Sequence, residues 1–390
     1  MNKKGIKNTS LLLLILFLFG FSSCISMLTD IGVSSILGYS SSMIDNNMKT
    51  LDPDASYTKR ASTFLTLMGD EAKMQELAEN NPGIVDAVLG SKRDQNKKVI
   101  ITTPDYEMPA YLVYPDEIKD DKLYPVIMFS HGGGFELWDF SKYESFCANL
   151  ANKCDAVVFF YEFRKAPKFK FPYGVNDTFE AYRWIINDAN CALWNLDSSR
   201  IVLAGDSSGG NFMAGLSIRI LEEGLKSPCG VLLLYPSLDV SRSFNYSRLA
   251  FSGLEEGAPV FVDDFRYLVS VSNKYLEKPE DAYKPYASPL IMLEGLLEVD
   301  GFDNPYKDYK AKLSLPLQLP EHLICVPQVD SLRDEGKMYH AMLRILGAKS
   351  TLIEYKGMFH GFTLADIAFY QAEECINDSA DFINRLFYAD

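Results

Sequence analysis

A glycine-rich turn after a short apolar strand constrains this chain more than any other stretch. Residues 200–211, RIVLAGDSSGGN, contain the apolar run Ile201–Ala204 and then a G-x-S-x-G pattern centred on Ser207. Apolar residues at helical spacing follow, and Gly224 ends the predicted helix. A serine on so tight a turn has a strained backbone conformation. The residues two positions before and after it must be glycines, because the turn leaves no room for side chains there. The pattern alone also fits a turn without chemistry, so other motifs must decide.

Apolar runs that suit strands alternate with helical patterns along most of the chain. Such alternation predicts a largely parallel sheet with helices on both faces, and it places reactive groups at the carboxyl ends of the strands. The predicted helices span Val175–Ala189, residues 332–346 and residues 365–387. The predicted strands are Val99–Thr102, Ala110–Tyr114, Val126–Phe129, Ala156–Tyr161, Ile201–Ala204, Val231–Tyr235, Leu323–Val326 and Thr351–Tyr355.

Composition excludes several classes of protein. Of the 390 residues, 47% are hydrophobic and 13% aromatic, which excludes a disordered chain. The net charge of −14 argues against a nucleic-acid partner, because such proteins need a basic face. Seven cysteines are present, but none forms a C-x-x-C or a cluster with zinc spacing. One disulfide is possible, and the sequence cannot pair its cysteines.

The N-terminus has the pattern of an export signal. Lys3, Lys4 and Lys7 precede the apolar run Leu11–Phe21, and Ser22-Ser23-Cys24 follows. This pattern predicts a signal peptide over residues 1–23. The small residues before Cys24 resemble a bacterial lipoprotein box, which implies a lipid on Cys24 and anchoring at an extracytoplasmic membrane surface. An ordinary secretory signal and an uncleaved anchor are the alternatives.

Two segments stand apart from the alternating pattern. Residues 24–97 contain amphipathic helical pieces without visible chemistry. Residues 237–320 interrupt the main domain, residues 98–390, with a long stretch that is rich in aromatic residues and has no clear strand. We expect both segments to contribute to a helical cap over the serine.

A glycine loop, Ser130–Phe135 with the sequence SHGGGF, follows the predicted strand Val126–Phe129. Its three glycines allow backbone N–H groups to approach a bound ester oxygen closely. We predict that the N–H groups of Gly132, Gly133 and Ser208 stabilise an oxyanion. His131 is interpreted as a structural residue that orients the loop.

The remaining histidines and acids suggest a base and an acid for Ser207. His322 opens a strand and His340 lies within a helix, whereas His360 follows a predicted strand in a loop where a mobile imidazole belongs. Asp330 also ends a strand, and the order serine, aspartate, histidine is one of those known for such triads. Asp334 and Glu335 are rival acids, but both fall in the first turn of a helix, where acids ordinarily serve the helix dipole.

These motifs together resemble the hormone-sensitive-lipase-like branch of the α/β-hydrolases, which includes carboxylesterases and arylacetamide deacetylase. The resemblance covers roughly residues 99–390 and rests on HGGGF, GDSSGGN, DSLRDEG and FHGF, with support from FRKAP and ASPL. Lys168 and Gln328-Val329 depart from the family pattern without touching the predicted triad.

The resemblance implies an α/β-hydrolase fold with a mostly parallel eight-stranded sheet and a helical cap. It implies a serine carboxylester hydrolase that acts on a small-molecule ester, with short to medium acyl chains, and that needs no cofactor or metal. A lipase, an amide or peptide hydrolase, and a non-catalytic ligand-binding protein on the same fold are the alternatives. The plant hormone receptors of this branch lack the triad histidine, whereas His360 is present here.

Overall fold

The computed structural model describes residues 96–119, 121–242, 247, 265–296, 316–365 and 370–388. The predicted signal peptide, Cys24 and almost all of the predicted N-terminal cap segment lie outside these residues. Parts of the predicted insertion do so as well, and the domain boundaries therefore remain predictions.

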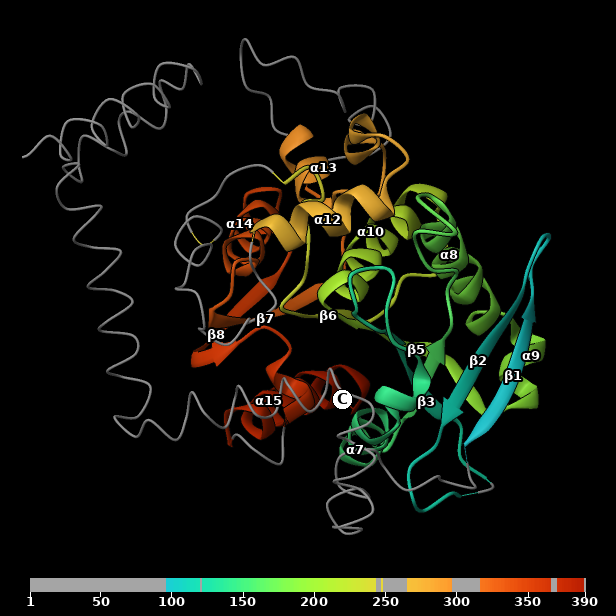
Figure 1. Cartoon of the computed structure of the whole chain (residues 1–390). Coiled ribbons are helices and arrows are strands. Elements are labelled where there is room, and N and C mark those ends of the chain that lie inside the picture. The colour runs from blue at the N-terminus through green and yellow to red at the C-terminus, as the bar shows by residue number, and fades with distance from the viewer. Residues whose placement is uncertain are drawn as a thin grey trace, which may run out of the picture. The chain divides into compact units, whose positions relative to one another are not determined.

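Eight strands form one sheet in the order β1-β2-β4-β3-β5-β6-β7-β8 (Figure 1). The two pairs that involve β2 are antiparallel, and all the others are parallel. Every predicted strand is present, and most extend further than predicted. The strands are β1 Lys97–Thr102, β2 Glu107–Val113, β3 Tyr124–Ser130, β4 Val157–Tyr161, β5 Leu196–Asp206, β6 Gly230–Leu234, β7 Glu321–Val329 and β8 Ser350–Phe359.

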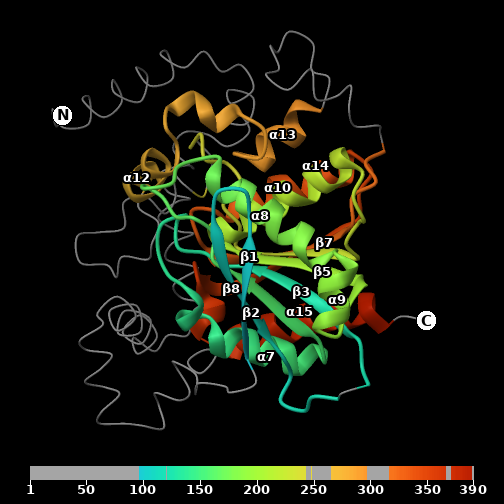
Figure 2. The same ribbon diagram turned by 90° about the vertical axis from the view of Figure 1, so that its right-hand side faces the viewer.

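Helices cover both faces of this sheet (Figures 1 and 2). Helices α7 and α15 pack on one face, and α8, α9, α10 and α14 pack on the other. The helices are α7 Glu144–Cys154, α8 Tyr173–Ile185, α9 Asp188–Leu193, α10 Ser207–Glu223, α12 Phe265–Tyr275, α13 Pro289–Gly295, α14 Arg333–Ile345 and α15 Tyr370–Tyr388, with the 3-10 turns η1 Phe140–Lys142, η2 Pro279–Tyr283 and η3 Phe362–Ala365.

Burial on both faces explains why the central strands read as continuous apolar runs. Along β5, Ile201 and Leu203 join the core on the α10 side, and Val202 and Ala204 join the core on the α15 side. Strand β4 is completely buried along its length. Side chains alternate between the faces of a strand, so a strand with helices on both sides needs apolar residues at every position.

The prediction of one continuous helix over Val175–Ala189 was wrong near its C-terminal end, where two helices meet. Helix α8 ends at Ile185, and Asn187 adopts an extended backbone that starts α9. The Asn187 side chain accepts the N–H groups of Ala189 and Asn190 at 3.0 and 3.2 Å. An asparagine favours this capping position over a helix interior, because its side chain competes for backbone groups.

The six described cysteines are all free. Among the described residues, no helix is both long enough and apolar enough to cross a membrane.

Candidate active site

Ser207 lies on the turn between β5 and α10 and has the strained backbone that the sequence predicted. Its φ of +51° falls in the left-handed region that side chains disfavour. A Cβ atom added at Gly205 would lie 2.7 Å from backbone atoms of Gly209, and one added at Gly209 would lie 2.1 Å from the Ser130 carbonyl oxygen. The turn thus requires both glycines, as predicted, and it leaves Ser207 partly exposed at the end of a central strand.

The imidazole of His360 lies between Ser207 and Asp330. Its Nε2 is 2.9 Å from Ser207 Oγ, and its Nδ1 is 3.0 Å from Asp330 Oδ2. Asp330 directly follows β7 and His360 directly follows β8, and these strands are parallel neighbours. The sheet therefore brings together three residues that are far apart in the sequence, at the edge where the parallel strands end.

The surroundings of His360 suit proton transfer. Asp330 is 1% exposed and His360 is 8% exposed. Asp330 Oδ1 also accepts the Leu332 N–H at 2.7 Å, which fixes the orientation of the carboxylate. When the proton is on Nδ1, the ring donates to Asp330, and Nε2 can accept the proton of the Ser207 hydroxyl.

The rival acids Asp334 and Glu335 have other partners. Asp334 accepts the Ser247 N–H at 2.7 Å and lies beside the Arg333 guanidinium. Glu335 is completely buried, and its Oε2 accepts the N–H groups of Leu238 and Asp239 at 2.6 and 2.8 Å. The interpretation of Glu335 as a helix-dipole charge was therefore incomplete, because this carboxylate ties α14 to the segment that follows β6.

The prediction that Gly132 supplies an N–H to an oxyanion was wrong. This N–H donates to Asp206 Oδ1 at 2.7 Å and lies 3.1 Å from the Tyr143 hydroxyl oxygen, so it is already occupied by the protein. Gly133 and Gly134 follow with φ values of +108° and +62°. Neither of their N–H groups has an acceptor within the described part of the chain.

Ser208, the third predicted oxyanion residue, lies in the first turn of α10. Backbone N–H groups in a first turn have no acceptor within the helix, and the helix dipole makes them favourable to negative charge. The Ser208 side chain accepts the Phe135 N–H at 3.1 Å, which holds the end of the glycine loop beside the start of α10. Gly133 and Ser208 therefore stay predicted oxyanion donors, and Gly134, whose N–H likewise has no acceptor among the described residues, joins them as a candidate.

His131 is completely buried. Its Nδ1 is 2.7 Å from the Gly132 carbonyl oxygen, and its ring stacks between those of Phe160 and Phe163. Complete burial lowers the pKa of His131 to about 3, so the ring stays neutral. These contacts agree with a structural role in the glycine loop.

The sequence reasoning missed Asp206 and Tyr143, which lie behind the glycine loop. Asp206 is 2% exposed, and its Oδ2 accepts the Tyr143 O–H at 3.0 Å. Burial raises the pKa of Asp206 to about 7, although hydrogen bonds from Gly132 and Tyr143 oppose the rise. The available signal for Asp206 was an acidic residue two positions after the apolar run Ile201–Ala204. No sequence pattern around Tyr143 indicated its role.

Helix α12 lies against the glycine loop. A Cβ atom added at Gly134 would lie 3.2 Å from a Val271 methyl group and 3.5 Å from the Tyr267 hydroxyl oxygen. The ring of Tyr275 stacks on Phe135 with centroids 3.8 Å apart. Side chains of α12 therefore form a wall beside the candidate oxyanion donors.

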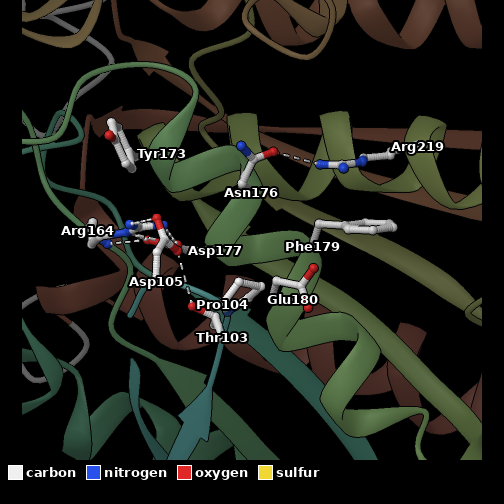
Figure 3. A pocket seen from close by; sticks show the side chains of 10 residues that line it. All are labelled: Thr103, Pro104, Asp105, Arg164, Tyr173, Asn176, Asp177, Phe179, Glu180 and Arg219. Carbon is white, nitrogen blue, oxygen red and sulfur yellow. Dashed lines mark hydrogen bonds and ion pairs between the residues drawn. The ribbon is translucent and has the colours of Figure 1, made fainter. Parts of the chain in front are cut away.

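A separate pocket of about 270 Å³ lies beside Arg164 (Figure 3). The Arg164 guanidinium donates hydrogen bonds of 2.7 to 3.1 Å to the carboxylates of Asp177 and Asp105. These bonds anchor the FRKAP stretch to α8 and to the β1–β2 turn. The pocket is lined by Thr103, Pro104, Asp105, Arg164, Tyr173, Asn176, Asp177, Phe179, Glu180 and Arg219, and so contains none of the residues around Ser207.

Comparisons with known proteins agree with this architecture. An arylesterase of Saccharolobus solfataricus is 28% identical to the chain over 276 residues, which are 70% of this chain and 78% of the arylesterase. The hormone-sensitive lipase of Mus musculus is 29% identical over 211 residues, which are 50% of this chain and 28% of the lipase. The solved structure of a Pyrobaculum calidifontis esterase matches with a TM-score of 0.66 and 26% identity, covering 81% of this chain and 93% of the esterase.

The predicted resemblance and fold class are thereby confirmed. The model of a family described as having the α/β hydrolase fold matches residues 127–364, a range that includes Ser207, Asp330 and His360. The chain therefore belongs to this α/β-hydrolase family.

Proposed function

We propose that this protein is a serine carboxylester hydrolase in which Ser207, His360 and Asp330 form the catalytic triad. The observation that carries the proposal is the continuous hydrogen-bonded chain from Ser207 Oγ through His360 to Asp330. Membership of a family whose matched relatives include an arylesterase supports the reaction class. The contact between His360 and Ser207 weighs against a purely ligand-binding protein.

The geometry supports the following reaction. Ser207 Oγ attacks the ester carbonyl carbon while its proton passes to His360 Nε2, and Asp330 stabilises the resulting imidazolium. The N–H groups of Gly133, Gly134 and Ser208 then stabilise the negative oxygen. When the bond from carbon to the alcohol oxygen breaks, His360 returns the proton to that oxygen. Water, activated by the same imidazole, then releases the acid and frees Ser207.

We further propose a preference for short to medium acyl chains. Val271 and Tyr267 stand beside Gly134, where they limit the space next to a bound ester. Val271 is 3% exposed, so little room exists around its side chain without movement of α12. A long acyl chain would have to displace this wall or pass beside it.

Initial rates on matched esters and amides test the function. The purified protein should hydrolyse p-nitrophenyl acetate and butyrate much faster than the p-nitroanilides of the same acids. Ser207→Ala should lose about 10⁴- to 10⁶-fold in kcat while its circular dichroism spectrum stays unchanged, because only a hydroxyl is removed. Faster cleavage of the anilides would favour an amide hydrolase, and full activity of Ser207→Ala would refute the triad.

For localisation, we propose that the mature chain begins at Cys24 and is held at an extracytoplasmic membrane surface by lipid. The support is the N-terminal pattern of lysines, an apolar run and small residues before Cys24. A single acyl chain holds a protein only marginally, whereas several chains anchor it firmly.

A further inference from the structure

We propose that Asp206 and Tyr143 form a clamp that positions the glycine loop against Ser207 for catalysis. The clamp consists of the Asp206 carboxylate, the Tyr143 hydroxyl and the Gly132 N–H. Both side chains are positioning residues, since they act through the loop and not on the substrate. The inference rests on the proposed esterase function and adds residues that its triad and oxyanion donors do not include.

The three groups of the clamp contact one another in a closed triangle. The Gly132 N–H is 2.7 Å from Asp206 Oδ1, the Tyr143 hydroxyl oxygen is 3.0 Å from Asp206 Oδ2, and the Gly132 nitrogen is 3.1 Å from the Tyr143 hydroxyl oxygen. Tyr143 is completely buried and Asp206 nearly so. Buried hydrogen bonds of this kind hold their groups tightly, because no water competes for them.

The clamp lies one residue away from both halves of the reacting site. Asp206 precedes Ser207, and Gly132 precedes Gly133 and Gly134, the candidate oxyanion donors. Strands β3 and β5 pair in parallel up to Ser130 and Gly205 and no further. Beyond that point the hydrogen bond from the Gly132 N–H to the Asp206 side chain connects the two segments, as backbone hydrogen bonds do within the sheet.

Close packing makes this link rigid. A Cβ atom added at Gly132 would lie 2.6 Å from Asp206 Oδ2 and 3.1 Å from Ser207 Cβ. No side chain fits at residue 132 unless the clamp opens. The glycine loop therefore contacts both the carboxylate and the nucleophilic turn directly.

Stability alone does not account for a carboxylate at this place. Within the described residues, no lysine or arginine forms a salt bridge with Asp206. Burying a carboxylate without a cation is costly, and apolar residues often replace such groups without loss of stability. Alignment of the oxyanion donors supplies a reason for its presence, since these donors must lie 2.7 to 3.1 Å from the developing oxyanion.

The test compares kcat, KM and affinity for a transition-state analogue in Tyr143→Phe, Asp206→Asn and Asp206→Ala. Misplaced donors reduce the stabilisation of the transition state more than they reduce binding of the ester, so kcat should fall while KM stays within about twofold. We expect losses of about 10-fold for Tyr143→Phe and about 100-fold for Asp206→Ala. Asp206→Asn should lie between them, because its amide oxygen can still accept the Gly132 N–H.

A phenylethylboronic acid provides the second readout, because it bonds to Ser207 Oγ and forms a tetrahedral adduct. Its inhibition constant should rise by the same factor by which kcat falls. The matched control is Tyr114→Phe, which removes a buried hydroxyl that donates to the Trp194 carbonyl oxygen at 2.8 Å. This control should lose stability without losing kcat.

The outcomes separate the two proposals. If the wild-type protein hydrolyses no ester, the proposed function itself has failed. If the wild type is active but Tyr143→Phe keeps the kcat of Tyr114→Phe, or if the boronate binds every variant equally, the clamp proposal is refuted. Should Asp206→Ala fail to fold, Tyr143→Phe and Asp206→Asn decide the question by the same criteria.

Discussion

Replacing Asp330 by asparagine should inactivate the protein through the tautomer of His360. In the wild type, Asp330 Oδ1 accepts the Leu332 N–H at 2.7 Å, and Oδ2 faces His360 Nδ1 at 3.0 Å. An asparagine has a single side-chain oxygen, so only one of these two hydrogen bonds can keep its acceptor. If that oxygen keeps the Leu332 N–H, the NH₂ group faces Nδ1 and moves the imidazole proton to Nε2, which can then no longer accept from Ser207.

The opposite orientation of the amide is also unfavourable. It would turn the NH₂ group towards the Leu332 N–H and leave two buried donors facing each other, at a cost of about 1 to 3 kcal/mol. The equivalent tautomer change in a serine protease lowers kcat by about 10⁴-fold, which corresponds to about 5 kcal/mol of activation free energy. We expect a loss of the same order for Asp330→Asn.

Asp334→Asn is the matched control, because Asp334 contacts Ser247 and Arg333. It should keep kcat within about threefold, since it changes only a partly exposed charge near a helix end. Both variants are assayed with p-nitrophenyl butyrate after thermal unfolding has shown that they are folded. An inactive Asp334→Asn protein, or an Asp330→Asn protein with more than about a tenth of wild-type kcat, would refute the assignment of Asp330.

Three further changes have defined outcomes. Burial raises the pKa of Asp206 from 3.8 to about 7 in the folded protein, so its contribution to stability is complete below about pH 4 and is lost as the pH rises through 7. Asp206→Asn does not titrate, so its free energy of unfolding should rise relative to that of the wild type by up to about 4 kcal/mol over this pH range. Urea unfolding at pH 4.5 and 8 measures this, and the same difference between variant and wild type at both pH values would contradict it. Val271→Ala should raise the ratio of octanoate to acetate hydrolysis about tenfold by opening space beside Gly134, and an unchanged ratio of kcat/KM values would count against the α12 wall. Cys24→Ser should release the protein from the membrane fraction of a bacterial host, and a wild-type N-terminus found unmodified by mass measurement would exclude lipidation.

The sequence predicted the strands and the meeting of Ser207, His360 and Asp330 because both depend on local patterns. Each central strand contains a continuous apolar run, since helices bury both of its faces there. Asp330 and His360 each follow such a run, and parallel strands end at the same edge of a sheet. The order of the motifs along the chain therefore contained most of the information about which side chains meet.

The prediction for Gly132 was wrong because the direction of a backbone N–H depends on groups from elsewhere in the chain. Asp206 and Tyr143 take this N–H, and Tyr143 reaches it from the segment that precedes α7. No pattern within the glycine loop distinguishes Gly132 from Gly133 or Gly134. Glu335 was misjudged for a similar reason, since the N–H groups that donate to its carboxylate, those of Leu238 and Asp239, lie on a distant segment.

Labelling with a fluorophosphonate tests the central claim most directly. The reagent phosphonylates a serine only when a neighbouring base activates the hydroxyl and donors stabilise the anionic oxygen. Peptide mass mapping of the labelled wild-type protein should place one adduct on Ser207, and neither Ser207→Ala nor His360→Ala should acquire it at a comparable rate. An unlabelled wild type, or an adduct on a different serine, would contradict the account.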